Sequence, residues 1–380
     1  MAQAGTGSPP LSRLAYIDAL RGIAIIGVIA THTAFLFQGI PWRVGRLIGL
    51  GGGGVQLFFV ASALTLLLSW HSRHETAAQF YVRRLFRIAP MFWLALAVYT
   101  SLDAILVHPF WIEGTVDART ILLTIIFCHG WSPDSINAVV PGGWTIAVEM
   151  TFYVMLPVLA TCITSLRRAC LLVIASILVA AVANTLYPTL AHAEPTHQVA
   201  EFTSYWLPEA LPSFALGFIA FHLSDRLPVS RLLAGALLFG AMLTGLYLAW
   251  GPLPYSATLL QPISRGPVSA AAGVMLALSL DLIPTGWLVN RVICYVGRVS
   301  YSVYLTHWLL LEALLLTVGQ VHASPAVAFV LWLCTVPVVI AASVGLSTLT
   351  YRWVETPGIR TGSRIARGMR LRSAPQPTVV

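Results

Sequence analysis

The chain repeats one pattern from Ala15 to Tyr351, in which a long apolar run is followed by a short polar break. A helical run of about 18 residues or more is long enough to cross the ~30 Å hydrocarbon core of a bilayer. The pattern predicts ten such spans, at 15–37, 54–70, 80–101, 144–163, 168–187, 206–224, 231–250, 266–283, 291–318 and 325–351. We therefore expect an all-α integral membrane protein with about ten transmembrane helices.

The spans divide the chain into three parts. Residues 1–14 form a polar N-terminal segment that lacks the features of a signal peptide, because the first apolar run has the length of a span. Residues 15–357 form a single transmembrane domain. Residues 358–380 form a basic tail that contains proline, and we expect this tail to be cytoplasmic and disordered.

A shorter apolar piece at 121–131 is too short for a clear assignment, and the arginines decide whether it crosses. If it does not cross, 18 arginines lie on one side of the membrane and four on the other, namely Arg43, Arg46, Arg119 and Arg265. If it crosses, the split is 7 against 15. Positive residues gather on the cytoplasmic side. We therefore expect a re-entrant or interfacial segment at 121–131 and cytoplasmic positions for both termini.

Composition agrees with a membrane protein, since 57% of the 380 residues are hydrophobic and only 9% are charged. Soluble proteins carry about 25% charged residues. The net charge of +8 does not indicate a nucleic-acid partner, because six of the 22 arginines follow the last span and act as a topology signal. The five cysteines show no metal-ligand or disulfide spacing, so we expect no metal site.

Ionisable residues inside spans are costly and are candidates for function. The first span holds Asp18, Arg21 and His32. Arg21 and His32 are eleven residues apart, which places them on one stripe of a helix about 16 Å apart along its axis. Asp18 and Arg21 can also form an interfacial ion pair. His32 is either a proton acceptor or a helix-packing residue.

Three further segments carry candidate residues. Arg84 and Arg87 share one helix face, which suits phosphate binding, although arginines there also orient a helix in the membrane. Glu149 and His307 lie deep in their spans, where a buried structural pair is the alternative to catalysis. The chain topology predicts that His32, Glu149 and His307 lie toward the outer leaflet. The glycines at 51–54 are expected to give a flexible entry to the second span.

These residues resemble membrane acyltransferase family 3, whose members O-acylate polysaccharides, lipopolysaccharide, peptidoglycan and some antibiotics. The resemblance covers about 16–357 and rests on seven motifs in family order, which are YIDALRGIAIIGVIATH, GVQLFFVASA, RRLFRIAP, WTIAVEMTFY, LPSFALGF, YVGRVSYSVYLTHW and TYRWVETP with Glu355. Two positions depart from the family pattern. Ala61 to Ala63 replace a Ser-Gly element, and Met150 stands where a second acidic residue often follows.

The resemblance implies a bacterial inner-membrane enzyme that moves an acyl group, acetyl in most members, from cytoplasmic acyl-CoA to a sugar hydroxyl. His32 would be the general base, with an acyl-imidazole on His32 as the rival mechanism. Arg21, Arg84 and Arg87 would bind the CoA phosphates, and Glu149 and His307 would orient His32 or the acceptor. Glycans and glycosylated small molecules both fit as acceptors, and membrane lipids surround the protein.

A proton-coupled transporter that uses His32, Glu149 and His307 as a relay is the main alternative. Transporters are commonly built from repeated halves with helices broken at matched places. The sequence contains no such repeat. A flippase or scaffold is a weaker alternative, because neither needs a deep stripe that carries both arginine and histidine.

Overall fold

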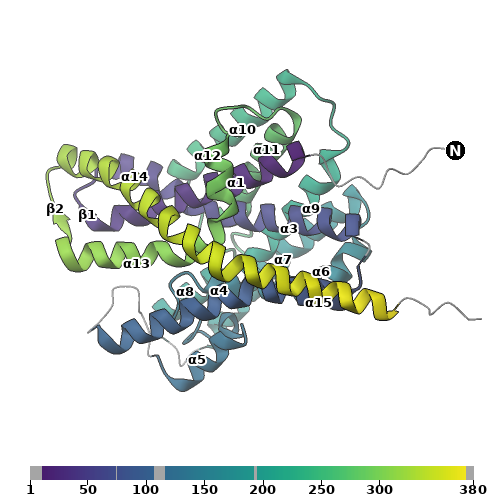
Figure 1. The fold of residues 1–380 in the computed structure, drawn as a ribbon. Coiled ribbons are helices and arrows are strands. Elements are labelled where there is room, and N and C mark those ends of the chain that lie inside the picture. Colours follow the sequence, from purple (N-terminus) through teal and green to yellow (C-terminus); the bar gives the residue numbers. More distant parts are fainter. Residues whose placement is uncertain (1–10, 74, 107–115, 192–194, 374–380) are drawn as a thin grey trace, which may run out of the picture.

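The computed structural model describes residues 11–73, 75–106, 116–191 and 195–373, and these are almost entirely helical (Figure 1). The α-helices are α1 (Leu11–Thr33), α2 (Trp42–Ile48), α3 (Gly54–Arg73), α4 (Ala77–Ile105), α5 (Ala118–Ile125), α6 (Trp144–Cys162), α7 (Leu166–Leu190), α8 (Thr196–Tyr205), α9 (Leu207–Ser224), α10 (Arg231–Trp250), α11 (Arg265–Leu282), α12 (Arg291–Arg298), α13 (Ser300–Val318), α14 (Pro325–Thr350) and α15 (Thr356–Ser373). Three short 3₁₀ helices, η1 (Ala34–Leu36), η2 (Gly49–Gly53) and η3 (His129–Trp131), a π-helix η4 (Tyr351–Glu355) and strands β1 (Phe37–Gln38) and β2 (Val321–His322) complete the chain.

Within the described residues, nine helical segments are long and apolar enough to cross a membrane. Helix α11 corresponds to the eighth predicted span, 266–283, and is not among those nine, because Arg265 and Asp281 lower its mean hydropathy. It nevertheless packs against α3, α9 and α10 inside the bundle. The predicted all-α, multi-span membrane fold is therefore confirmed.

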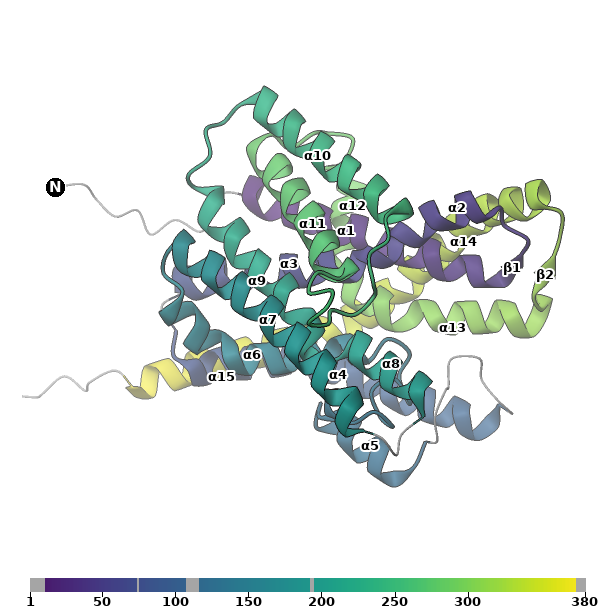
Figure 2. The same cartoon turned by 180° about the vertical axis from the view of Figure 1, so that it is seen from behind.

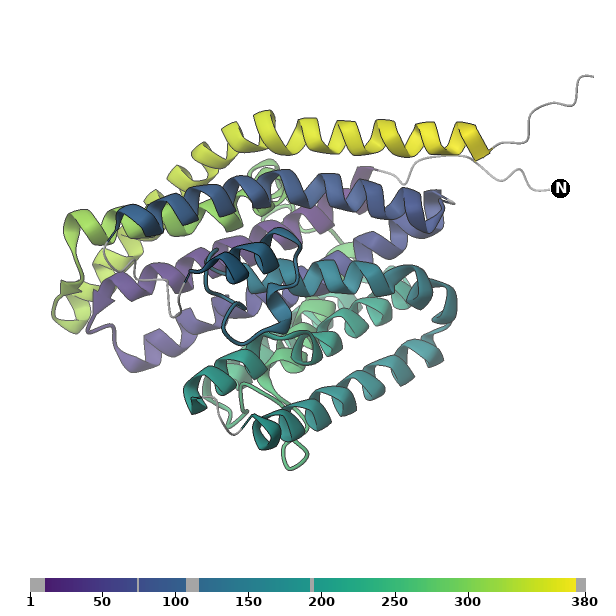
Figure 3. The same cartoon turned by 90° about the horizontal axis from the view of Figure 1, so that it is seen from below.

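Helix α1 occupies the centre of the bundle and packs against α3, α12, α13 and α14. Helices α7, α9, α10 and α11 form the side that faces the viewer in Figure 2. Figure 3 shows α15 lying along α4 at the opposite edge. Helix α1 begins and α15 ends at one end of the bundle, which we call the terminal end; the parallel pair β1–β2 marks the other end, which we call the β end.

Two sequence predictions need correction here. The predicted span at 291–318 is two helices, since α12 ends at Arg298 and α13 begins at Ser300. The tail predicted to be disordered from residue 358 is helical through Ser373, because Gly358 and Gly362 allow α15 to pack closely on Phe86 of α4. Residues 374–380 lie outside the described part of the chain, as do residues 1–10 of the predicted polar N-terminal segment.

The segment 121–131 contains the end of α5 and the short turn η3. The eight residues of α5 are about 12 Å long, well short of a ~30 Å bilayer core, so this helix does not cross the membrane. His129, which follows α5 in the chain, is buried. Its Nε2 lies 3.0 Å from the Gly143 carbonyl oxygen, and its ring stacks on Phe92. Burial lowers the pKa of His129 to about 4.

Glycines let α1 approach its neighbours at backbone distance. Gly27 packs against Gly51, and Gly54 packs against the Ala24 carbonyl, so the glycine run serves close helix contact rather than the predicted flexible entry. On another side of α1, Gly297 of α12 sits against the Asp18 carbonyl. In lipid, small residues at helix interfaces supply the packing that holds helices together.

We predict that Gly297→Ala destabilises the protein, because a Cβ there would overlap the Asp18 carbonyl oxygen, which belongs to rigid helix backbone. Overpacking of this kind costs about 1–3 kcal/mol or more. Gly345→Ala is the matched control, since a Cβ at this α14 position meets no atom within 4 Å. Thermal unfolding in detergent should show a lower Tm for Gly297→Ala alone, and equal Tm values would contradict the close contact.

His129 should make stability depend on pH. Its pKa is about 4 in the folded protein and about 6.5 when unfolded, so below pH 6.5 the unfolded chain binds more protons. Stability from this group is therefore complete above pH 6.5 and falls as the pH drops toward 4. We expect the Tm of wild type to fall more between pH 7.5 and 5.5 than that of His129→Gln. Identical slopes for the two proteins would exclude His129 as the titrating group.

Candidate functional site

Two cavities adjoin inside the bundle. The first, which we call the arginine cavity, has a volume of about 80 Å³ and contains Arg21, Arg84 and Arg87. The second, which we call the histidine cavity, has a volume of about 1090 Å³ and contains His32. Helix α1 contributes Arg21 to the first and His32 to the second, so one helix carries a functional residue into each cavity.

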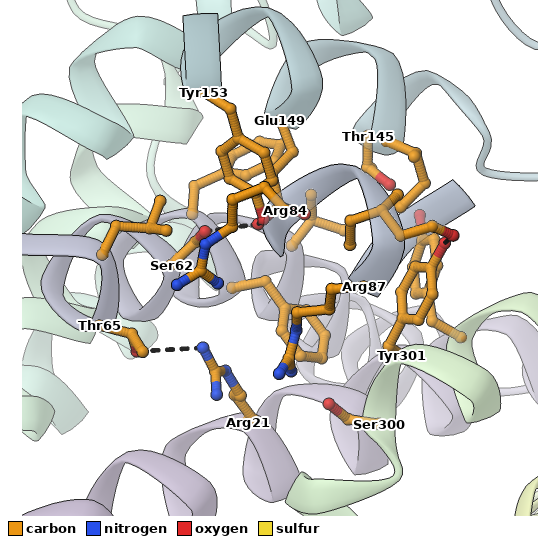
Figure 4. A pocket seen from close by; sticks show the side chains of 17 residues that line it. Arg21, Ser62, Thr65, Arg84, Arg87, Thr145, Glu149, Tyr153, Ser300 and Tyr301 are labelled. Carbon is orange, nitrogen blue, oxygen red and sulfur yellow. Dashed lines mark hydrogen bonds between the residues drawn. The ribbon is translucent and has the colours of Figure 1, made fainter. Parts of the chain in front are cut away.

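The three guanidinium groups point into the same small space (Figure 4). Arg21 donates from Nη2 to Thr65 Oγ1 at 3.0 Å. Arg84 lies over the rings of Phe80 and Tyr153, and its buried Nε has no hydrogen-bond partner in the described structure. An unpartnered buried donor of this kind is costly unless a ligand accepts its hydrogen bond.

Arg87 is attracted by Glu355 of η4, which is fully buried and accepts a hydrogen bond from Ser302 at 3.0 Å. Arginine in a fixed position is the residue best suited to phosphate, because its planar donors match phosphate oxygens. The sequence predicted that Arg84 and Arg87 share a helix face. The structure brings both together with Arg21.

Glu149 lies in the arginine cavity, although the sequence predicted a place near His32 and His307. Its Oε1 accepts hydrogen bonds from Ser62 and from Tyr153, the latter at 2.6 Å. No described guanidinium forms an ion pair with it within 4.0 Å. The described hydrogen bonds of Glu149 are thus to Ser62 and Tyr153 and not to His32. The described lining of this cavity carries three cations and one carboxylate, so the space has an excess of positive charge.

His32 and His307 are in direct contact, with Nδ1 of His32 2.9 Å from Nε2 of His307. Their rings are stacked at 5.2 Å between centroids, and the Trp308 ring lies 4.3 Å from His32. His307 is fully buried. The fold thus brings together two histidines that are 275 positions apart in the chain.

Neighbouring carbonyls fix the protons on this pair. His307 Nδ1 lies 2.8 Å from the Tyr304 carbonyl oxygen, which can only accept, so this nitrogen carries the proton. In the neutral ring, Nε2 then accepts a hydrogen bond from Nδ1 of His32. His32 consequently keeps a lone pair on Nε2, the nitrogen that a general base needs to have free.

The histidine cavity combines aromatic and polar side chains. Its aromatic lining includes Phe35, Trp42, Trp144, Tyr205 and Trp308, and polar groups come from Asn137, Glu201, Glu209 and Gln320. Its volume of about 1090 Å³ slightly exceeds the range of about 300–1,000 Å³ that is usual for sites of drug-sized ligands. A mixture of ring faces and hydrogen-bonding groups suits a polyhydroxylated ligand better than a purely apolar one.

Sequence reasoning missed the neutral residues of the site. Ser62 and Tyr153 hold Glu149, and Tyr304 lines both cavities. Each lies inside a motif that the sequence analysis quoted, so position within those motifs was the available signal. Asp18, which can pair with Arg21 according to the sequence, also lies near Arg298, with 3.9 Å between Asp18 Oδ2 and Arg298 Nε.

Comparison with known proteins agrees with the motifs. The family model described as "Acyltransferase domain", of acyltransferase family 3, matches residues 14–352. The chain is 27% identical to "Nodulation protein 10" of Rhizobium leguminosarum bv. viciae, over 90% of this chain and 92% of the relative. It is 28% identical to "Exopolysaccharide production protein ExoZ" of Rhizobium meliloti (strain 1021), over 87% of this chain and 98% of the relative.

No solved structure matches the chain significantly. The family match extends over nearly the whole described bundle and includes Arg21, Arg84, Arg87, Glu149, His32 and His307. The chain therefore belongs to acyltransferase family 3, as its motifs predicted, and it is a multi-pass membrane acyltransferase.

Proposed function

We propose that the protein transfers an acyl group, acetyl above all, from acyl-CoA to a hydroxyl of a sugar or glycan. One observation carries the proposal. Arg21 and His32 are eleven residues apart on α1, and they line two adjoining cavities, of which the first is rich in positive charge and the second contains the free ring nitrogen of His32. The arginine cavity suits the phosphates of an acyl donor, and His32 in the histidine cavity can take the proton from the hydroxyl group of an acceptor.

The donor assignment rests on charge and reach. Three guanidinium groups with one carboxylate favour a polyanion, and the unpartnered Arg84 Nε favours an acceptor at close range. Arg21 and His32 are separated by about 16 Å along the helix, about the length of five extended peptide residues. The amide-linked pantetheine arm of CoA has a similar reach, so phosphates held by the arginines would place a thioester near His32.

The acceptor assignment rests on the lining of the histidine cavity and on a relative. Aromatic rings can stack on the faces of sugars, while carboxylates and amides bind hydroxyl groups. The relative from Rhizobium meliloti is named for exopolysaccharide production. A glycan, or a small molecule that carries a sugar, is therefore the acceptor class that we propose.

The reaction would run through His32. Its Nε2 takes the proton of the attacking hydroxyl while the hydroxyl oxygen bonds to the thioester carbonyl carbon. The carbon–sulfur bond then breaks, and the departing thiolate takes up that proton to give free CoA. His307 holds the His32 ring through the 2.9 Å contact and is a positioning residue. An acyl-imidazole formed first on His32 Nε2 is the alternative order of steps.

We propose the bacterial inner membrane as the location, with the terminal end of the bundle in the cytoplasm. Arginines of the tail and of the breaks at that end support this orientation under the positive-inside rule. Acyl-CoA would enter from the cytoplasm, and the acceptor would bind at the β end. A proton relay through His32, Glu149 and His307, as a transporter would need, is not supported, because Glu149 lies in the other cavity.

We predict that His32→Ala lowers transfer by about 10²–10⁴-fold, the usual contribution of a general base. The measurement is thiol release from acetyl-CoA in membranes of cells that produce the protein, with O-acetyl groups on their surface glycans counted by mass spectrometry. His197→Ala, at an exposed histidine of α8, is the matched control. Transfer by His32→Ala at the wild-type rate would refute the role of His32, and absence of thiol release by wild type would refute the donor.

Arg84→Gln should raise KM for acetyl-CoA by about 10- to 150-fold, the loss expected for one charge-assisted hydrogen bond of about 1.5–3 kcal/mol. Arg43→Gln is the control, because Arg43 is exposed on α2 and lines neither cavity. The same thiol-release assay at varied donor concentration gives both constants. An unchanged KM would show that Arg84 does not bind the donor.

A further inference from the structure

Tyr304 stands where the two cavities meet. Of the described lining residues, it is the one that contributes to both. On two other helices, neighbouring residues line different cavities. On α3, Val55 lines the arginine cavity and Gln56 lines the histidine cavity. On α6, Thr145 lines the arginine cavity and Trp144 lines the histidine cavity. The boundary between the cavities is therefore formed by α3, α6 and the Tyr304 ring of α13.

The Tyr304 ring is held firmly at this boundary. Its hydroxyl donates to the Gly142 carbonyl at 3.1 Å, and the same carbonyl accepts a hydrogen bond from Thr145 Oγ1 at 2.9 Å. The ring meets the edge of Phe58 at 6.3 Å between centroids. Tyr304 is 7% exposed, so it has little freedom to swing into open space.

The loop that receives the hydroxyl is also fixed. Gly142 has φ +72°, a conformation that favours glycine, and its N–H donates to Asn137 Oδ1 at 2.9 Å. A Cβ at Gly142 would come within 2.6 Å of the Tyr304 hydroxyl. Glycine at this position thus leaves the space that the phenol occupies, and the ring and the loop together form one wall.

A donor anchored on the arginines must send its thioester past this wall, because His32 lines the cavity beyond it. The acyl group is the leading tip of the donor. A linear acyl chain is no wider than the unbranched cysteamine and β-alanine part of the arm that follows it. An acyl group branched next to the carbonyl is wider than that part, so it meets the Tyr304 ring first.

We propose that Tyr304 determines which acyl groups the enzyme accepts by limiting their width, admitting linear acyl groups and excluding branched ones. This inference rests on the proposed function, since it requires an acyl-CoA donor bound at the arginines. Tyr304 acts as a specificity-determining residue. One methyl group too many in a tight protein site changes specificity by about 10–200-fold.

The test compares thiol release from acetyl-CoA, butyryl-CoA and its branched isomer isobutyryl-CoA, in membranes whose own glycans supply acceptors. The two four-carbon donors have the same atoms and differ in branching alone. We expect Tyr304→Ala and Tyr304→Leu to raise the isobutyryl-to-acetyl ratio of kcat/KM by at least about tenfold, and to raise use of isobutyryl more than use of butyryl. Tyr304→Leu keeps apolar volume and serves if Tyr304→Ala fails to fold.

Tyr304→Phe keeps the ring and should keep the wild-type ratio, and Tyr247→Ala, at a half-exposed residue on α10, controls for general effects of losing a tyrosine. A merely structural role would lower turnover of all three donors alike and leave the ratios unchanged, which would overturn the proposal. Equal gains for butyryl and isobutyryl would also overturn it. If wild type releases thiol from no donor, the proposed function fails first and the width limit fails with it.

Discussion

Close backbone contact around α1 is the constraint on which the rest of the structure depends. Lipid tails are as apolar as leucine, so helices in a bilayer gain little from burying apolar surface against each other. Glycines replace that driving force, since Gly27 and Gly54 bring α3 and its entry to α1 while Gly297 brings α12 to another side. With α1 held in this way, Arg21 and His32 occupy fixed positions in two cavities.

The second constraint is electrostatic. A charge in a low-dielectric interior is costly unless an opposite charge or a ligand compensates it. The bundle meets this demand in part, because Glu355 faces Arg87 and Glu149 shares the cavity with Arg21 and Arg84. The carboxylate of Glu149 accepts hydrogen bonds from Ser62 and Tyr153 rather than from an arginine. The remaining positive charge is suited to an anion, and the uncompensated charge lowers the stability of the bundle around the arginine cavity.

From the sequence we could predict the features that depend on ionisable residues within apolar segments. Arg21, Arg84, Arg87, His32 and His307 are conspicuous because polar residues in apolar runs are costly, and the apolar runs themselves gave the membrane fold. It could not predict that Glu149 lies with the arginines, because Ser62 and Tyr153 look ordinary within apolar helices. The break at Val299 was missed because the apolar residues of the amphipathic helix α12 are followed closely by the apolar helix α13, although Arg291 and Arg298 stand at the ends of α12. Helix α15 was mistaken for disorder because its arginines conceal the glycine face that packs on α4.

The π-helix η4 gives the end of the chain a further property. A π-turn contains one residue more than an α-turn, and here the extra winding directs Glu355 inward toward Ser302 while Gly358 and Gly362 face α4. An α-helix that gains one residue must either rotate everything beyond the insertion by about 100° or take up the extra residue as a π-turn. Here the π-turn takes it up and Gly358 and Gly362 stay on α4. The chain can therefore differ in length by one residue at this junction without loss of the contact between α15 and α4.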